Sequence, residues 1–144
     1  MASLSQSLAL GSEYVQGSKT YKLAPCTFEI QALFETYLER QDLEAYNRLK
    51  GRLDRDDREI MLAAIQHKAA MRTWTFGGRG AREALDQRPH LEYMLFLMIS
   101  KNHPEVSLSD VREMFEKDAE GIMRAANRAN ADPNSPGETS LPTK

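Results

Sequence analysis

Residues 93–116 read Tyr-Met-Leu-Phe-Leu-Met-Ile-Ser-Lys-Asn-His-Pro-Glu-Val-Ser-Leu-Ser-Asp-Val-Arg-Glu-Met-Phe-Glu and carry the clearest structural signal in the chain. Their first part is apolar on nearly every side, which is typical of the most buried helix in a domain. Pro104 ends that helix, because proline cannot continue the helical hydrogen bonds. Ser107, with Asp110 three residues later, is close to a capping box and starts a second, amphipathic helix. The stretch therefore predicts a mainly α-helical fold.

Similar signals extend the helical pattern toward both ends of the chain. Thr27 and Asp54 are suitable N-cap residues for two long helices, and Pro89 suits the first turn of the buried one. The polar residues 39–42 mark either a break or an exposed turn of one continuous helix. Residues 19–23 alternate polar and apolar side chains and predict a short strand, whose partner the alternation leaves open. The expected helices cover approximately 27–53, 54–72, 81–87, 89–99 and 107–130.

Residues 19–130 are expected to form one domain of about four main helices with a short N-terminal strand. Residues 1–18 and 131–144 are poor in periodic apolar positions, so we expect a flexible N-terminal arm and a disordered tail. Two further helices repeat mainly apolar side chains at helical spacing. The 54–72 helix carries Ile60, Met61, Ala64, Ile65, Lys68 and Met71, and the 107–130 helix carries Val111, Met114, Phe115, Ile122, Met123 and Ala126.

Size and composition are those of a soluble globular protein. With 144 residues, 41% of them apolar and 28% charged, the chain can bury a core without a metal or a disulfide. The net charge of −2 does not require nucleic acid or an anionic membrane as a partner. Cys26 is the single cysteine, and no apolar run is long enough to cross a membrane. We therefore expect a cytoplasmic protein.

No pattern of catalytic, cofactor-binding or metal-binding residues stands out. His67, His90 and His103 lie in different elements and lack the i, i+4 pairing of a helical metal site. The glycine-rich residues 77–80 lack the Lys-Ser/Thr of a P-loop and indicate a loop between helices. Cys26 has no local nucleophile signature, and the G-x-S-x-G motif is absent. We expect a protein that is not an enzyme, with no catalytic residue, cofactor or metal.

Charge is distributed unevenly along the chain. Residues 68–88 contain five basic and two acidic side chains, a balance of +3, whereas residues 105–120 have a balance of −4. Trp74 and Phe76 beside the basic segment could stack on nucleic acid bases. Five cations are few at physiological salt, however, which favours a protein contact, a solvated loop, or a Trp74 side chain tucked into the core.

A protein partner is therefore the expected ligand, and the loop after residue 72 is its expected binding surface. The candidate residues on that loop are Trp74, Phe76, Arg79 and Arg82, with Met114 and Met123 as a second choice. Methionine suits such a surface because its flexible thioether adapts to varied apolar partners. The composition also leaves room for a homo-oligomer.

Three segments resemble the tail assembly chaperones of long-tailed bacteriophages. They are Lys-Thr-Tyr-Lys-Leu-Ala-Pro at 19–25, the helix start at 27–29, and the segment 95–111 with its apolar helix, basic residue, His-Pro-Glu and small polar cap. The resemblance covers about residues 19–130. The glycine-rich loop and the Trp74/Phe76 pair do not map onto the family pattern, so no individual binding residue is carried over.

The resemblance implies a small helical protein of the host cytoplasm that coats the tape measure protein and helps it recruit tail-tube subunits. Such a protein is absent from the finished virion, and in that family a longer form is often made by ribosomal frameshifting. Two other classes stay open: a structural head–tail or tail component of the virion, and a small phage regulator that binds a host protein or nucleic acid.

Overall fold

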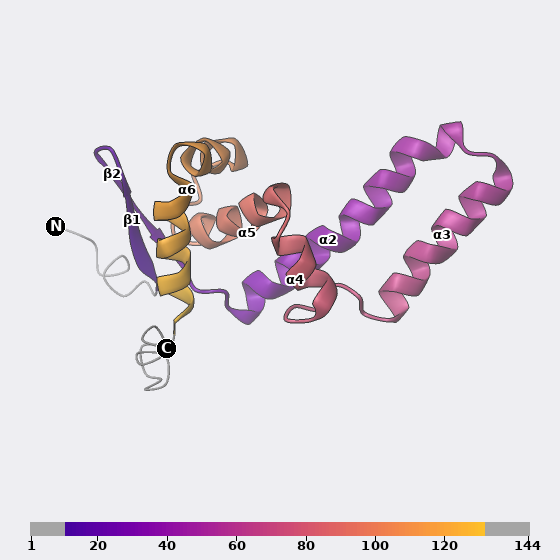
Figure 1. Cartoon of the computed structure of the whole chain (residues 1–144), viewed down its shortest axis with the longest axis horizontal. Coiled ribbons are helices and arrows are strands. Elements are labelled where there is room, and N and C mark those ends of the chain that lie inside the picture. The colour runs from indigo at the N-terminus through magenta and orange to yellow at the C-terminus, as the bar shows by residue number, and fades with distance from the viewer. Residues whose placement is uncertain (1–10, 132–144) are drawn as a thin grey trace. The chain divides into compact units, whose positions relative to one another are not determined.

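The computed structural model describes residues 11–131 and is mainly helical, with a two-stranded antiparallel sheet near the N-terminus (Figure 1). This confirms the predicted fold class. The elements are β1 (Ser12–Gln16), β2 (Lys19–Leu23), α2 (Phe28–Leu49), the 3-10 helix η1 (Lys50–Arg52), α3 (Arg55–Ala70), α4 (Arg79–Leu85), α5 (Arg88–Ser100) and α6 (Leu108–Asn130).

The chain divides into two compact units. Among the described residues, the first combines the segment 11–30 with the segment 92–131, and the second is Gln31–Leu91. The expectation of one helical domain over residues 19–130 stays a prediction. The expected tail lies almost entirely outside the described residues.

The hairpin β1–β2 corrects the expectation of a flexible arm over residues 1–18. Ser12 pairs with Leu23 and Gln16 pairs with Lys19, so a two-residue turn connects the strands. Gly17 opens that turn with a φ of 63°, a left-handed conformation that glycine adopts without steric cost. The strand expected at 19–23 is confirmed, and its partner precedes it in the same chain. Residues 1–10 of the expected arm lie outside the described residues.

One face of β1 is hydrogen-bonded to α6. Successive residues of a strand point to opposite faces, so Ser12, Tyr14 and Gln16 share a face. Each of the three donates a hydrogen bond to that helix, and polar side chains therefore provide the packing contacts that apolar residues provide in most strands. The acceptors are the Ala125 carbonyl for Ser12, Asp118 Oδ2 at 3.2 Å for Tyr14, and the Met114 carbonyl at 3.4 Å for Gln16.

Helix α6 changes direction at Asp118, which the sequence did not reveal. Asp118 has a non-helical backbone conformation, with φ −155° and ψ 63°, so α6 is two helical segments in succession (Figure 1). Its carboxylate accepts the N–H of Gly121 at 3.0 Å and thereby caps the second segment from inside the chain. A Cβ at Gly121 would lie 2.2 Å from that carboxylate, so the cap needs glycine there. The predicted capping box of Ser107 and Asp110 is present at the first residue of α6.

The turn between α5 and α6 holds the backbone of β2. His103 Nε2 accepts the N–H of Lys22 at 2.7 Å, and Asn102 Nδ2 donates to the Lys22 carbonyl at 3.1 Å. Two residues after Lys22, the Ala24 N–H donates to the Met98 carbonyl at 2.9 Å. Side chains of the turn thus satisfy the outward backbone groups of Lys22, which a neighbouring strand would satisfy in a larger sheet.

The core of the first unit is apolar and centres on α5, as the sequence predicted. Its fully buried large side chains come from β2, the start of α2, α5 and α6, and α5 buries six of its 13 residues. They are Leu23, Ile30, Leu95, Met98, Ile99, Val111 and Ile122.

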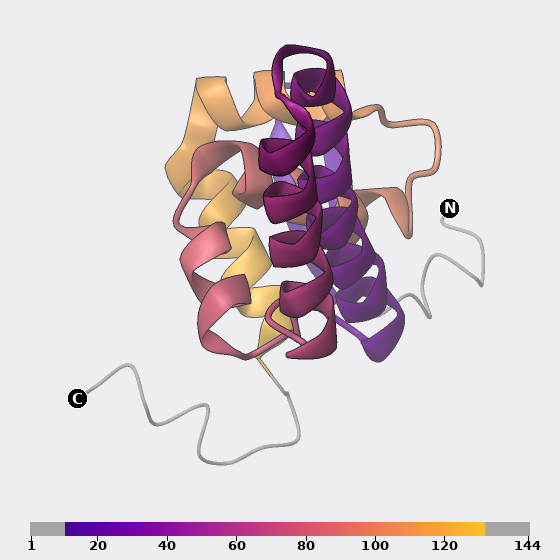
Figure 2. The same cartoon turned by 90° about the vertical axis from the view of Figure 1, so that its right-hand side faces the viewer.

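The second unit is a helical hairpin followed by the short helix α4. Helix α2 is continuous through residues 39–42, which resolves the choice between a break and an exposed turn. Asp54 caps α3 by accepting the N–H of Asp57 at 2.8 Å, as predicted. Helix α3 runs back alongside the later part of α2 (Figures 1 and 2).

The contact between His103 and Lys22 predicts that His103→Ala will destabilise the protein. The substitution leaves a partly buried backbone N–H without its acceptor, which costs about 1–2 kcal/mol of the free energy of unfolding. His103→Gln, whose side-chain oxygen can reach a similar position, is the matched control and should cost less. Denaturant unfolding measures the free energies, and hydrogen exchange of the Lys22 amide locates the effect. An unchanged exchange rate in His103→Ala would refute the assignment.

Candidate functional site

Trp74 lies inside the second unit, where it fastens the loop after α3 to α2. Its indole Nε1–H donates to Asp42 Oδ2 at 2.9 Å. Lys68 Nζ lies 3.8 Å from Asp42 Oδ1 and 5.5 Å from the centroid of the Trp74 ring. One carboxylate of α2 therefore joins α3 and the loop. Trp74 is half-buried by these contacts, which correspond to the predicted alternative of a tryptophan tucked into the core.

The end of α3 directs the chain toward this contact. Thr73 N–H donates to the Lys68 carbonyl at 3.0 Å and Arg72 N–H donates to the Ala69 carbonyl at 3.1 Å. This is a Schellman arrangement, in which the residue after the helix takes a left-handed conformation. Arg72 occupies that position with a φ of 53°, where glycine is more common. The reversal places Trp74 next to Asp42.

Phe76 is also used within the second unit. Its backbone N–H donates to Glu35 Oε2 at 2.6 Å, and its ring meets Phe34 edge to face with 6.4 Å between centroids. Phe34 is fully buried and Phe76 half-buried. The two aromatic residues expected to contact a partner are therefore engaged in the packing of their own unit.

The remaining predicted residues are dispersed. Arg79 and Arg82 lie exposed on α4, and Arg79 Nε is 2.8 Å from Glu83 Oε1. Met114 and Met123 belong to α6 in the first unit, where Met114 is 4% exposed and Met123 half-buried. The structure brings Trp74 and Phe76 into one loop and does not gather the six residues into one surface of either unit.

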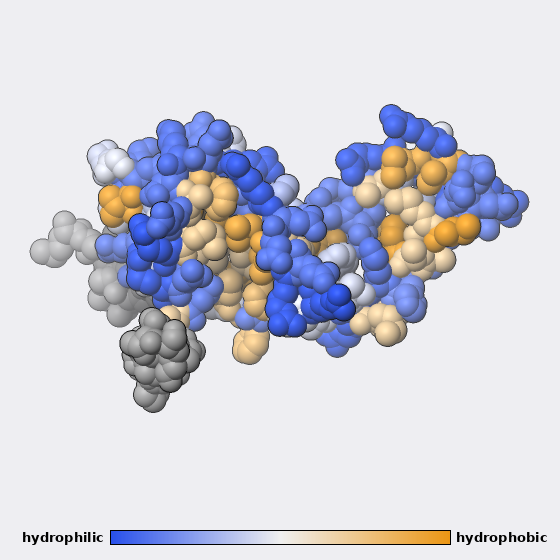
Figure 3. Space-filling view, in the orientation of Figure 1, coloured by the Kyte–Doolittle hydropathy of each residue, from blue (hydrophilic) through white to orange (hydrophobic). Residues whose placement is uncertain are grey.

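The least covered part of the described chain is the α2–α3 hairpin. Helix α3 has no buried residue. Among residues 11–131, five of the seven exposed large apolar side chains belong to the second unit. Figure 3 shows the resulting apolar areas, in orange, over α2 and α3. These side chains and their exposed fractions are Leu33 (47%), Leu43 (47%), Leu49 (39%), Ile60 (67%) and Met71 (67%).

Helix α3 has two apolar faces, and the sequence analysis combined them into one. Half-buried Met61, Leu62 and Ile65 form the first face. Ile60 and Met71, with exposed alanines between them, form a second face that is open to solvent. The signal was present in the sequence, because at 100° per residue Ile60 and Ile65 lie on nearly opposite sides of a helix. An apolar helix surface on both sides predicts two contacts.

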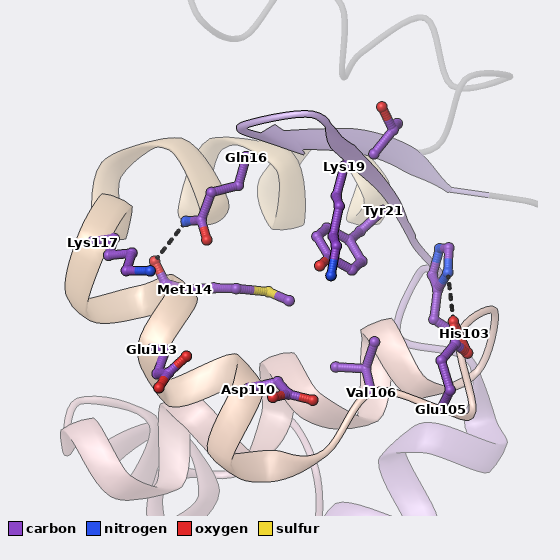
Figure 4. Close-up of a pocket in the computed structure, with 11 residues that line it drawn as sticks. Gln16, Lys19, Tyr21, His103, Glu105, Val106, Asp110, Glu113, Met114 and Lys117 are labelled. Carbon is purple, nitrogen blue, oxygen red and sulfur yellow. Dashed lines mark hydrogen bonds and ion pairs between the residues drawn. The ribbon is translucent and has the colours of Figure 1, made fainter.

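A pocket of about 600 Å³ lies in the first unit among β2, the turn after α5, and α6 (Figure 4). Its charges are mixed, with Lys19 on the β2 side and Asp110, Glu113 and Lys117 on the α6 side, and the Met114 side chain points into it. Asp110 belongs to the α6 capping box, and the hydrogen bonds from Ser107 hold the pKa of its carboxyl below the usual range. The lining residues are Gln16, Lys19, Thr20, Tyr21, His103, Glu105, Val106, Asp110, Glu113, Met114 and Lys117.

His103 and Cys26, the side chains here with catalytic potential, both make contacts within the first unit. His103 Nε2 accepts a backbone N–H, so the ring proton lies on Nδ1, 3.5 Å from Glu105 Oε1 (Figure 4). Cys26 is partly buried with its Sγ 3.5 Å from Met94 Sδ, and this burial raises the pKa of the thiol and disfavours the nucleophilic thiolate. Within residues 11–131 no group of three or more His, Cys, Asp or Glu side chains is arranged to hold a metal ion.

Comparison of the chain with protein-family models, with curated proteins and with solved structures gave no match. In the part of the chain that the structure describes, no helix is both long enough and apolar enough to span a bilayer.

Trp74→Phe is expected to lower the free energy of unfolding by about 1–2 kcal/mol. The substitution keeps an aromatic ring but removes the N–H that donates to a carboxylate, and hydrogen bonds to charged groups are among the stronger ones. Asp42→Asn keeps an acceptor oxygen and serves as the matched comparison. Denaturant titration measures both variants. A Trp74→Phe midpoint equal to that of the wild type would contradict the role assigned to this bond.

His90 should make stability depend on pH. Its Nδ1 lies 2.8 Å from the Tyr37 hydroxyl, and partial burial lowers the pKa of His90 below its ordinary value of 6.5. The unfolded chain then binds a proton at a higher pH than the folded chain. The contribution of neutral His90 is thus complete above pH 6.5 and declines as the pH falls through the folded pKa. The difference in unfolding free energy between wild type and His90→Gln should shrink on acidification, and a constant difference would contradict it.

Proposed function

We propose that this protein is a non-enzymatic binding protein whose α2–α3 hairpin takes an apolar, helical protein partner. Within that class, we propose a tail assembly chaperone of a long-tailed bacteriophage, which binds the tape measure protein in the host cytoplasm and helps it recruit tail-tube subunits. The uncovered hairpin supports the binding role, and the resemblance of residues 19–25, 27–29 and 95–111 supports the phage role.

The observation that carries the binding role is the absence of any buried residue in α3. Single exposed apolar side chains are ordinary on protein surfaces. A helix of 16 residues that buries none of them, beside exposed leucines on α2, has apolar surface that its own unit does not remove from water. Contiguous apolar surface of this kind marks interaction sites. The partner is proposed to be helical because apolar positions at three- and four-residue spacing match another helix.

The family motifs and the hairpin lie in different units. The three segments that resemble the family belong to the first unit, where they form β2, the start of α2, the buried helix α5 and the turn that holds Lys22. The exposed side chains of α2 and α3 belong to the second unit. The segments that resemble the family therefore contribute no residue to the proposed binding surface.

A nucleic-acid regulator has less support. Within the second unit, Lys68 lies beside Asp42 and Arg79 beside Glu83, so these cations already have acidic partners. Trp74 and Phe76, the rings that would stack on bases, are engaged as well. A virion component stays an alternative that particle composition decides.

The test is co-expression with the tape measure protein of the same genome, followed by capture at moderate salt. The wild type should be recovered in several copies per partner, and Leu33→Ser/Leu43→Ser should bind roughly a hundredfold more weakly, because each leucine would lose about 1.5 kcal/mol of apolar burial. Val15→Thr is the control, since Val15 is 59% exposed but belongs to the first unit.

Failure of capture with both proteins soluble would refute the chaperone proposal. Recovery of the protein in purified particles would favour the virion component. Retention on DNA that weakens steeply with salt would favour the regulator.

A further inference from the structure

Strand β2 has one edge position whose backbone groups are open. Alternate residues of an antiparallel strand direct their N–H and C=O groups to the same side, so Thr20 and Lys22 share the outer edge of β2. Both groups of Lys22 are bound by the turn after α5, through His103 and Asn102. Thr20 is exposed, and within residues 11–131 neither of its groups has a partner on that edge. One N–H and one C=O are therefore free to bind another molecule.

The pocket of about 600 Å³ in the first unit opens at this edge. Thr20 and His103 both line it, together with Tyr21 on β2 and Met114 on the first segment of α6 (Figure 4). Its volume lies within the range of ligand-binding pockets. Val106 and Met114 are 7% and 4% exposed and Tyr21 is half-buried, so a ligand in the pocket would contact apolar side chains.

Charge in the pocket favours a basic ligand residue over an acidic one. The charged lining residues, with a balance of −1, are Lys19, Lys117, Glu105, Asp110 and Glu113. The Asp110 carboxylate accepts the Ser107 N–H in the capping box, and Glu105 lies 3.5 Å from His103 Nδ1. Glu113 is exposed and has neither a hydrogen bond nor an ion pair within the described part of the chain. It is therefore the carboxylate that a basic group can reach.

We propose that this pocket binds a short extended peptide segment of a partner protein, with an apolar side chain next to Tyr21 and Met114 and a basic side chain beside Glu113. The peptide runs antiparallel to β2, and one of its residues exchanges two main-chain hydrogen bonds with Thr20. This is the way a strand is added to the open edge of a sheet. An extended peptide fits because it carries an N–H and a C=O on one residue, both facing the edge.

The faces of β2 set the order of side chains in the peptide. Tyr21 is paired with Tyr14 and shares its α6-facing side, so Thr20 points away from α6. Residues directly opposite each other point to the same face, so the peptide residue opposite Thr20 also points away. Its two neighbours point toward the pocket, and the apolar and basic residues are therefore two positions apart. Because the turn already binds Lys22, the paired segment is limited to about three residues.

This site is separate from the α2–α3 hairpin proposed above as a binding surface. All of its residues belong to the first unit, and its ligand is extended rather than helical. It is tested without the tape measure protein. Failure of peptide binding would leave the proposed function standing, and failure to capture the tape measure protein would leave this site standing.

The experiment titrates the isotope-labelled full chain with blocked pentapeptides and follows the amide chemical shifts by NMR. The probes are acetyl-Val-Leu-Val-Lys-Val-amide and acetyl-Val-Lys-Val-Leu-Val-amide, which place the leucine on either side of the central valine. One of them should shift the Thr20 and Met114 amides saturably, with a Kd on the order of 0.1–1 mM because the contact is small. Hydrogen exchange of the Thr20 amide should slow at saturation.

Two changes in the peptide isolate the two kinds of contact. Serine in place of leucine should raise the Kd at least about tenfold, because the apolar side chain that enters the pocket is lost. N-methylation of the central valine should abolish the saturable shifts, because its N–H donates to the Thr20 carbonyl. Both changes leave the protein itself unaltered.

A pair of protein variants tests the charge. Glu113→Lys should raise the Kd roughly fivefold, because the basic side chain of the peptide then meets a like charge. Glu116→Lys is the matched control, since it makes the same charge change at an exposed position of α6 that does not line the pocket. At physiological salt its Kd should stay within about twofold of the wild type.

Three results would overturn the proposal. The first is no saturable shift of the Thr20 amide with either leucine peptide up to about 5 mM. The second is equal affinity for the serine or the N-methylated peptide. The third is a shift of the same amides that grows with protein concentration in the absence of peptide, which would assign the edge to a second copy of the chain.

Discussion

The structure of the first unit depends on the hydrogen bonds between the turn after α5 and the backbone of β2. His103 and Asn102 bind the N–H and the carbonyl of Lys22, about eighty residues earlier in the chain. A two-stranded hairpin is marginal by itself, and these bonds, with those from β1 to α6, connect it to the helices. Because the N-terminal and C-terminal parts of the chain close on each other, residues 31–91 must leave the first unit and return to it.

That connectivity explains why the second unit is poorly covered. A segment of about sixty residues buries a smaller share of its surface than a larger domain does, and here much of it is a two-helix hairpin with no third layer over α3. Its buried apolar side chains are Phe34, Leu38, Ala81 and Ala84, and Asp42 adds polar contacts with Trp74 and Lys68. Five large apolar side chains of this unit stay exposed, which is the physical basis of the proposed binding role.

Helix positions were predictable because their signals are local. The caps at Asp54 and Ser107 and the apolar run of α5 were each sufficient to place a helix. Strand β1 was not predicted, because its packed face is Ser12, Tyr14 and Gln16, which bond to α6 through polar groups and show no apolar alternation. The dipeptide Gly17-Ser18 directly before the alternating segment 19–23 was the available signal for a hairpin. The turn of α6 at Asp118 had none, since aspartate within a helix is unremarkable until its cap partner Gly121 is seen.

For the candidate site, too, some features follow from the sequence and others from the tertiary structure. Sequence by itself determined that the protein is mainly helical, because periodicity and capping act within a few residues of one another. Only the tertiary structure decided which apolar side chains are covered, because burial depends on neighbours that are distant in the chain. It engaged Trp74 and Phe76 in the packing of their own unit and left Ile60 and Met71 in water. The type of a side chain determines what it can bind. The surrounding fold determines whether that side chain is exposed or already in contact with its own unit.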